Sequence, residues 1–327
     1  MVIPVYNKGP HIQRSISSVL NQSYQDFELI IVNDASTDNS LEEIMKFDDP
    51  RIRVLHRDQP GPGGYAARNL GIQEARADWI AFLDADDEWY PDHLSMHEKL
   101  IVEYPDVEVC GCGYSVVDRD YGTQRKYNDS YYSARSAQGV HRLSFLEYLQ
   151  AENAGLRPLW TSIATIRRNT LIEAGAFPED KANRGGDVDT WLRCVERAGG
   201  IAWSPHIGAT YFRDSVNMVT RTAYDDASKQ RTTIKGLMKE QSMTERRALK
   251  VFSNHRTISA WKTNWYADPN RANFFLPTKL FWAGDIKRAI TWSAFSILPN
   301  VVKTRAFRFA WAMKHSVRET ISSPKSS

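Results

Sequence analysis

Three carboxylates stand close together in the first third of the chain. Asp84, Asp86 and Asp87 follow directly on an apolar run at 79–83. Clustered carboxylates repel one another, so a cation is expected to compensate them. Oxygen-only ligands favour Mg²⁺ or Mn²⁺ over zinc, and such ions usually bind substrate phosphates as well. The alternative is a solvated turn or a helix cap, because Asp is common at both.

The hydrophobic pattern indicates the elements that would position these carboxylates. Strands are expected at 1–6, 27–32, 52–56 and 79–83, and helices at 11–22, 40–47 and 65–75. This alternation predicts an α/β domain with a largely parallel sheet. Ligands of such sheets lie at the carboxyl ends of the strands. Asn7, Asp34 and the acidic segment 84–87 follow three of these strands, so they form one candidate site.

Five segments in this order resemble family 2 of the inverting nucleotide-sugar glycosyltransferases, whose fold is called GT-A. They are VIPVYN at 2–7, IIVNDASTD at 30–38, ARNLG at 67–71, AFLDADD at 81–87 and GDVDTWLR at 186–193. The resemblance implies a Rossmann-like, mostly parallel central sheet flanked by helices over residues 1–222. Within it, a nucleotide-sugar-binding half would span about 1–105 and an acceptor and catalytic-base half about 106–222.

The resemblance also implies roles for single residues of the donor site. Tyr6 would lie against the nucleotide base, and Asp34 would accept a hydrogen bond from its ring. Arg68 would help to hold the nucleotide, Asp84 would contact the ribose, and Asp86 would bind the metal, with Asp84 as a second candidate ligand. The full set of expected nucleotide-sugar contacts is Pro4, Tyr6, Asn7, Asp34, Arg68, Asp84 and Ala85. Mn²⁺ or Mg²⁺ is the implied cofactor.

On the acceptor side the resemblance makes Asp187 the catalytic base, with Asp189 as the fallback. Both could instead simply cap the helix that follows. Acceptor contacts are expected from Trp160, Thr161 and Asp87, although a packed strand explains the segment around 160 equally well.

The chain departs from the family pattern at three places. Gly186 stands where the family usually has Glu, and Ser215 stands where relatives often carry a His near the diphosphate. Arg213 is the candidate substitute for that His. Relatives also usually have several residues before the first strand, which here begins at once.

The charge is distributed unevenly along the chain. Residues 225–327 carry 19 Lys and Arg against seven Asp and Glu, a net +12, so the preceding residues carry −9 of the total of +3. Half of the Trp residues also lie there, and helices are expected at 285–298 and 303–317. We therefore expect a basic, Trp-rich helical extension over 223–327. It would pack on the catalytic domain, lie on an anionic membrane or join a second subunit. Positive charge without a reader motif argues against nucleic acid.

The sequence thus predicts an inverting, metal-dependent glycosyltransferase. It would move a sugar, with uridine as the default nucleotide, to a hydroxyl of a glycan or lipid-linked glycan in surface or extracellular polysaccharide synthesis. The alternatives are a catalytically weak nucleotide-sugar or glycan binding protein, and a sugar nucleotidyltransferase. The sugar, acceptor and linkage stay open.

Location follows from what the sequence lacks. A cytoplasmic protein, or one peripheral to the inner face of the membrane, is expected because there is no signal peptide and no membrane-length apolar run. Three Cys in no zinc-ligand spacing indicate reduced core residues. We expect that His56, His93 and His97 are not clustered with Cys, so zinc is not expected.

Overall fold

The computed structural model describes residues 1–118, 123–126, 139–179, 182, 184–213, 215–216, 227–267, 276–300 and 302–303. Nearly all of the predicted helix at 303–317 and the segment 217–222 lie outside this part of the chain.

The first half of the chain forms the elements that its hydrophobic pattern predicts. They are β1 (Val2–Val5), α1 (Gly9–Leu20), β2 (Leu29–Asp34), α2 (Ser40–Ile44), β3 (Ile52–Arg57), the 3₁₀ helix η1 (Pro62–Gly64), α3 (Tyr65–Glu74) and β4 (Trp79–Ala81). β1, β2 and β3 pair in parallel, with β2 in the middle. A parallel bridge from Val2 to Phe82 joins this sheet to the chain that leaves β4.

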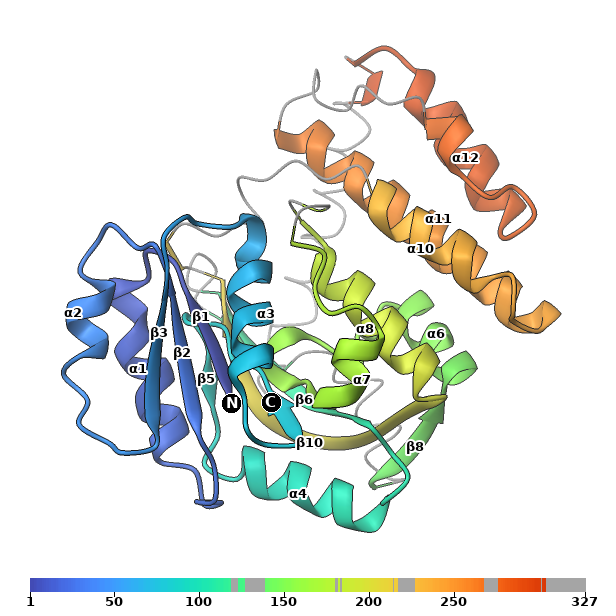
Figure 1. Ribbon diagram of the computed structural model, residues 1–327. Helices are drawn as coiled ribbons and strands as arrows, with labels where there is room; N and C mark the ends of the chain where they lie inside the picture. The colour runs from blue at the N-terminus through green and yellow to red at the C-terminus, as the bar shows by residue number, and fades with distance from the viewer. Residues whose placement is uncertain are drawn as a thin grey trace, which may run out of the picture.

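Both faces of this sheet are covered, which explains why β1 and the first four residues of β2 are continuously apolar, whereas the edge strand β3 carries polar residues and is only partly buried. Ile3 and Ile31 pack with α1 in one core cluster, while Val2 and Ile30 pack with α3 in the other. Figure 1 shows α1 and α2 on one side of β1–β3 and α3 on the opposite side. The alternation of side chains along each strand thus sends neighbouring residues into two different cores.

The second half builds a mixed sheet. Its further elements are β5 (Glu88–Trp89), α4 (His93–Glu103), β6 (Val109–Asp118), β7 (Thr123–Lys126), β8 (His141–Ser144), α6 (Phe145–Asn153), η3 (Thr161–Ile163), β9 (Thr165–Arg167), α7 (Arg168–Glu173), α8 (Gly186–Arg197) and β10 (Gly200–Phe212). The strand order is β4-β9-β6-β10-β5, with β6 and β10 parallel and β9 antiparallel to both of its neighbours. The three-stranded sheet is therefore entirely parallel, whereas among the described strands of the seven-stranded sheet only β6 and β10 pair in parallel.

The basic C-terminal region is helical, as predicted. It contains α10 (Ser228–Leu237), α11 (Met243–Ala267), η4 (Leu276–Lys279) and α12 (Ile286–Ile297). Ile234, Leu249 and Phe252 belong to the same core cluster as residues of α6 and α8. Farther along α11, Trp261 and Trp265 build a separate small core with α12. Figure 1 shows α11 and α12 extending away from the sheet.

Two further sequence predictions concern the cysteines and the membrane. The three cysteines are free and buried, in agreement with their predicted place in the core. Among the described residues, we find no helix that combines the length and the apolar character needed to cross a bilayer.

Candidate active site

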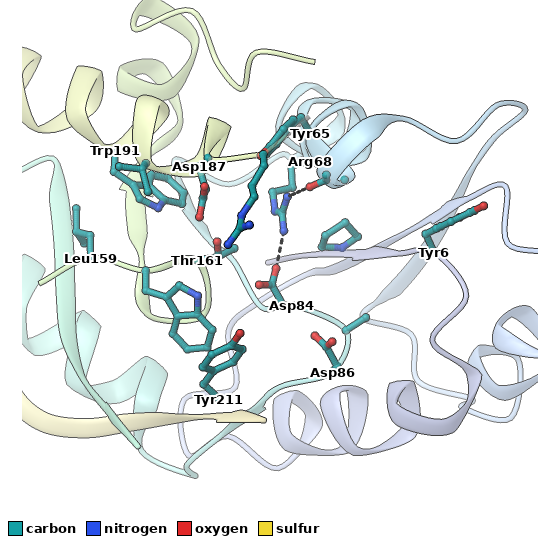
Figure 2. A pocket seen from close by; sticks show the side chains of 18 of the residues that line it. Tyr6, Tyr65, Arg68, Asp84, Asp86, Leu159, Thr161, Asp187, Trp191 and Tyr211 are labelled. Carbon is teal, nitrogen blue, oxygen red and sulfur yellow. Dashed lines mark hydrogen bonds and ion pairs between the residues drawn. The ribbon is translucent and has the colours of Figure 1, made fainter. Parts of the chain in front are cut away.

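A cavity of about 310 Å³ opens where β1, β2 and β4 end and extends to the first turn of α8. Figure 2 shows Tyr6 at one end of it and Asp187 with Trp191 at the other. The predicted site residues that line it are Pro4, Tyr6, Asp34, Arg68, Asp84, Ala85, Asp86, Trp160, Thr161 and Asp187. The fold thus brings residues from both halves of the chain to a single cavity.

Asp84 is held by an arginine on the neighbouring helix. Arg68 Nη2 donates to Asp84 Oδ1 at 2.5 Å, while Arg68 Nη1 donates to the carbonyl of Gly63 at 2.8 Å. Burial raises the pKa of the Asp84 carboxyl; Arg68 opposes that rise and Asp86 adds to it. Arg68 therefore fixes Asp84 to α3 and to the glycine-rich loop before α3 (Figure 2).

Asp86 is paired with a lysine from the loop after β1. Lys8 Nζ lies 2.7 Å from Asp86 Oδ2 and also donates to the carbonyl of Val216 at 2.7 Å. Arg14 on α1 donates to the backbone carbonyl of Asp86. These contacts tie the acidic loop to the first helix and to the segment after β10.

The acidic pair suits a magnesium or manganese ion. In the described part of the chain, Asp84 Oδ2 and Asp86 Oδ1 accept no hydrogen bond, although both residues line the cavity. Such ions commonly take one or two carboxylates and fill their remaining positions with substrate phosphates and water. Asp84 and Asp86 therefore fit the implied cofactor, with Lys8 as the group that the ion would displace from Asp86.

Asp34 and Tyr6 form the other end of the cavity. Asp34 is almost fully buried and accepts hydrogen bonds from Arg57 and, at 3.1 Å, from the backbone N–H of Gly61. Tyr6 is 43% exposed, so its ring offers a free face. Asp34 thus links the ends of β2 and β3 to the glycine-rich loop beside Tyr6.

Two predicted residues lie behind the cavity rather than on its wall. Asn7 has a positive φ of 52° and its side-chain oxygen accepts the backbone N–H of Thr37 at 2.8 Å, which joins two loops. Asp87 is fully buried and accepts from the Ser162 hydroxyl at 2.7 Å and from the Phe212 N–H at 3.1 Å. Burial raises the pKa of Asp87 well above its ordinary value. Asn7 and Asp87 therefore connect the loops behind the cavity wall and do not line the cavity themselves.

The two candidate bases point in different directions. Asp189 is fully buried: its Oδ2 accepts from Arg193 at 3.0 Å and its Oδ1 from the Thr233 hydroxyl at 2.5 Å. Asp187 lines the cavity, and its carboxylate accepts no hydrogen bond from any described residue. Successive alternate residues on a helix are about 200° apart, so only one of the two can face the cavity. The free carboxylate is that of Asp187.

Gly186 makes room for Tyr65, a residue that no sequence motif singled out. Its N–H donates to the Tyr65 hydroxyl at 2.8 Å. A β-carbon at this position would lie 2.7 Å from Cζ of Tyr65 and 2.9 Å from Cγ of Pro178. The departure from the family's Glu is therefore coupled to the presence of Tyr65, which lines the cavity and joins α3 to α8.

The acceptor side of the cavity holds further charged side chains that sequence reasoning missed. They are Glu152, Arg157, Arg184 and Arg256. Burial raises the pKa of Glu152 to about 7, against the opposing effect of Arg157 and Arg256. Arg184 stands two residues before the segment 186–193, but Glu152, Arg157 and Arg256 lie in no recognised motif, so only the fold brings the four together.

Aromatic rings and Ser215 complete the wall and its surroundings. The Trp160 ring lies 4.9 Å from Tyr114 and 4.7 Å from Tyr211, measured between ring centroids. Ser215 is buried and donates to the carbonyl of Phe212 at 3.2 Å. Its hydroxyl is thereby used in a contact within the protein.

One prediction about metal ligands needs correction. His93 and His97, which the sequence separates from any Cys, lie with Cys112 so that their ligand atoms fall within 4.8 Å of one another. The two imidazoles are stacked, with centroids 4.5 Å apart and planes 25° apart. Because an imidazole binds a metal in its ring plane, near-parallel rings do not converge on one ion. Burial lowers the pKa of both, so they are neutral members of the core.

Known proteins with similar sequences are glycosyltransferases. The family model described as glycosyl transferase family 2 matches residues 1–174. An uncharacterized glycosyltransferase of Rickettsia bellii is 42% identical over 206 residues, which are 62% of this chain and 27% of that protein. The chain spans about a third of the length of the first curated relatives it matches.

Solved structures resemble the fold over most of its length. TarS from S. aureus, in complex with UDP-GlcNAc, superposes with a TM-score of 0.65 at 16% identity over 90% of this chain and 89% of that one. The mannosyltransferase PcManGT from Pyrobaculum calidifontis, in complex with GDP-Man and Mn²⁺, gives a TM-score of 0.54 at 17% identity over 96% and 85%. The predicted GT-A fold is confirmed by this likeness.

Proposed function

Because this chain belongs to glycosyltransferase family 2, we propose that it transfers a sugar from a nucleoside-diphosphate sugar to a hydroxyl group of a glycan or lipid-linked glycan. The observation that carries this proposal is the single cavity in which the free Asp187 carboxylate lies opposite the Asp84 and Asp86 pair. A base and a diphosphate-binding pair on one cavity are what a direct displacement requires.

The donor would occupy the end of the cavity formed by the first 105 residues. Tyr6 offers an aromatic face for a base, and Asp34 offers an acceptor for a ring N–H. UDP is the proposed nucleotide. Asp34 now accepts from Arg57, so that a uracil ring would have to share or replace that contact. TarS, with its UDP-GlcNAc, is similar in fold and supports this assignment.

Asp86, with Asp84 as its partner, would hold Mn²⁺ or Mg²⁺. When bound, the ion would supply a positive charge that stabilises the departing diphosphate. The Mn²⁺ in PcManGT supports the choice of metal, since GT-A glycosyltransferases commonly use divalent cations. Arg68 and Lys8 contact Asp84 and Asp86 and line the same cavity, so their positive charges would also attract the diphosphate.

The chemical step is a single displacement at the anomeric carbon. The acceptor oxygen forms a bond to that carbon while its proton passes to a carboxylate oxygen of Asp187, and the bond to the diphosphate oxygen breaks. Because one displacement occurs and no group of the chain attacks the sugar, the anomeric configuration inverts. Trp160 and Thr161 would position the acceptor, since both line the same cavity as Asp187.

The basic C-terminal extension packs on the catalytic domain, and we propose that it also contacts a membrane. We divide the chain at residue 222, with the domain before it and the basic helices after it. Ile286, Ile290 and Ile297 share the outward face of α12 and are 53–66% exposed, while Ala289 is buried against the rest of the extension. Lys287 and Arg288 are exposed beside this stripe. An apolar stripe with basic flanks suits an anionic lipid surface, which supports a peripheral position at the inner face of the membrane.

A donor-turnover assay tests the proposed enzyme. UDP-sugars are screened with the purified protein and Mn²⁺ for release of UDP, with and without oligosaccharide acceptors. Asp187→Asn should lower turnover by roughly 10²–10⁴-fold while UDP binding is retained, because only the base is lost. Asp26→Asn, at an exposed position, is the control. Turnover that survives both Asp187→Asn and Asp86→Ala would sink the mechanism.

A further inference from the structure

Three arginines line the acceptor end of the cavity. Arg157 follows α6, Arg184 precedes α8, and Arg256 lies on α11. Arg184 and Arg256 make no hydrogen bond or ion pair with any described residue. Arginine is the side chain best suited to bind carboxylate or phosphate in two-point geometry, so such a gathering needs a function or a compensating anion.

The helical pattern of α11 explains why Arg256 points inward. Leu249, Phe252 and Arg256 are spaced by three and four residues, so they share one face of the helix. Leu249 and Phe252 are buried in the core shared with α6 and α8. Arg256 therefore lies on the same face of α11 as the two core residues, and its guanidinium group reaches the cavity.

Arg256 lies beside the turn that carries the proposed base. Its Nη2 is 3.4 Å from the position that a β-carbon on Gly185 would occupy. Gly185 is the N-cap of α8, two residues before Asp187. The Nε atom of Arg256 is buried, and no hydrogen-bond partner for it occurs in the described part of the chain. A buried guanidinium N–H without a partner is costly, and an anion bound to the same guanidinium group would offset part of this cost.

The carboxylates nearby offset this positive charge only in part. Burial raises the pKa of Glu152 to about 7, and the charge of Asp187 acts in the same direction. Arg157 and Arg256 lower this pKa but do not cancel the effect of burial. Arg184 and Arg256 have no hydrogen-bond or ion-pair partner among the described residues, and a neutral glycan would leave their positive charge uncompensated.

We propose that the acceptor carries an acidic group, a phosphate or a carboxylate, and that Arg256 and Arg157 bind this oxyanion beside Asp187. This inference rests on the proposed function. Arg184, from the loop before α8, is a third donor to the same group. The donor diphosphate is served by different cations, since Lys8 and Arg68 hold the acidic pair at the other end of the cavity. The extension, which lies beyond the residues matched by the family model, thereby selects the acceptor.

Binding experiments separate this inference from the proposed enzyme activity. Calorimetry first measures UDP binding in the presence of Mn²⁺; failure there would contradict the proposed function itself. With UDP saturating, three disaccharides of equal size are then titrated: a neutral one, a phosphorylated one and one with a uronic acid. At least one acidic disaccharide should bind about tenfold more tightly than the neutral one, and the preferred one identifies the oxyanion.

Substitutions then assign the preference to the arginines. Arg256→Gln should abolish the tenfold preference and leave UDP affinity unchanged, and Arg157→Gln should weaken it. Arg247→Gln is the matched control, because Arg247 is exposed on α11 nine residues earlier and so on the opposite side of the helix. Thermal unfolding checks that each variant is folded. Equal binding of neutral and acidic disaccharides, or a preference that survives Arg256→Gln, would overturn the inference.

Discussion

Lys8 and Asp86 form an ion pair on the wall of the cavity, with Lys8 Nζ 2.7 Å from Asp86 Oδ2. Both side chains are only 13% exposed, so the pair is shielded from solvent. The ammonium group therefore competes with any divalent ion for the carboxylate that is expected to bind it. The positive charge of Lys8 would also hold the loop after β1 against the acidic segment in the absence of substrate.

Removal of this competitor should strengthen metal binding. Lys8→Gln is expected to bind Mn²⁺ about tenfold more tightly in the absence of nucleotide, an effect of about 1.4 kcal/mol that a partly shielded charge pair can supply. Titration followed by electron paramagnetic resonance measures the free Mn²⁺. Lys46→Gln, which removes an exposed partner of Glu43 at the same 2.7 Å, serves as control. Equal affinity in Lys8→Gln and the parent protein would show that Asp86 is not the metal ligand.

Asp189 should affect stability rather than chemistry. Its buried carboxylate accepts from Arg193 and from Thr233, so Asp189→Asn leaves at least one donor unsatisfied. We expect the free energy of unfolding to fall by about 1–3 kcal/mol. Turnover per folded molecule should fall far less than in Asp187→Asn. Urea denaturation and donor turnover measure the two effects, and a stable but inactive Asp189→Asn variant would reverse the assignment of the base.

The contact between Gly186 and Tyr65 predicts a coupled pair of substitutions. Gly186→Ala would place a β-carbon 2.7 Å from Cζ of Tyr65, and overpacking of this kind costs about 1–3 kcal/mol. Tyr65→Leu, which removes the obstructing ring, should make the same substitution at Gly186 less costly. A double-mutant cycle from denaturation curves gives the coupling. Additive effects would mean that the Tyr65 ring does not require Gly186.

Glu152 should make the stability depend on pH. Its pKa rises from 4.5 to about 7 on folding, chiefly through burial, so the folded state binds the proton more tightly. The contribution of Glu152 is complete below pH 4.5 and is lost as the pH rises through 7. Glu152→Gln should therefore melt at a higher temperature than the parent at pH 8, with little difference at pH 5. An equal difference at both pH values would show that Glu152 ionises normally.

Vesicle binding tests the outward face of α12. The parent protein should float with phosphatidylglycerol vesicles and much less with phosphatidylcholine vesicles, because the stripe is flanked by Lys287 and Arg288. The double substitution Ile286→Ser and Ile290→Ser should abolish flotation. Val102→Ser, at a position on α4 that is 69% exposed, should not. A protein that never floats would leave the stripe without a role in membrane binding.

The first half of the fold was predictable because β1 and β2 are buried on both faces. An apolar run such as that of β2 has few alternatives once it is bounded by polar residues, and the spacing of Ile12, Ile16 and Val19 indicates a helix. The mixed pairing of the second half was not predictable in the same way. β9 is three residues long, and its antiparallel position between β4 and β6 depends on contacts distant in sequence.

The site could be predicted where motif and strand end coincide, and not elsewhere. Asp84 and Asp86 follow a recognisable strand. By contrast, Asp187 and Asp189 share one helical turn, so their spacing does not distinguish them. What distinguishes them is a contact distant in sequence, because Thr233 on α10 donates a hydrogen bond to Asp189. Arg256 is one of many basic residues in the extension, and its sequence neighbours do not distinguish it. Asn7 and Asp87 were predicted to contact the substrates, but neither lines the cavity. Instead, Asn7 accepts a hydrogen bond from the backbone N–H of Thr37, and Asp87 accepts one from the backbone N–H of Phe212.

The attachment of α10 to the start of α8 bears on how this chain could be recombined with relatives. Gln230 donates to the carbonyl of Gly185 at 2.6 Å, so the extension is hydrogen-bonded to the turn that begins α8, two residues before Asp187. A chimera that exchanged everything after residue 226 would replace Gln230, Thr233 and Arg256 at once. The placement of the proposed base and the proposed selection of the acceptor would then come from the same parent, whereas the proposed donor end would remain that of the other.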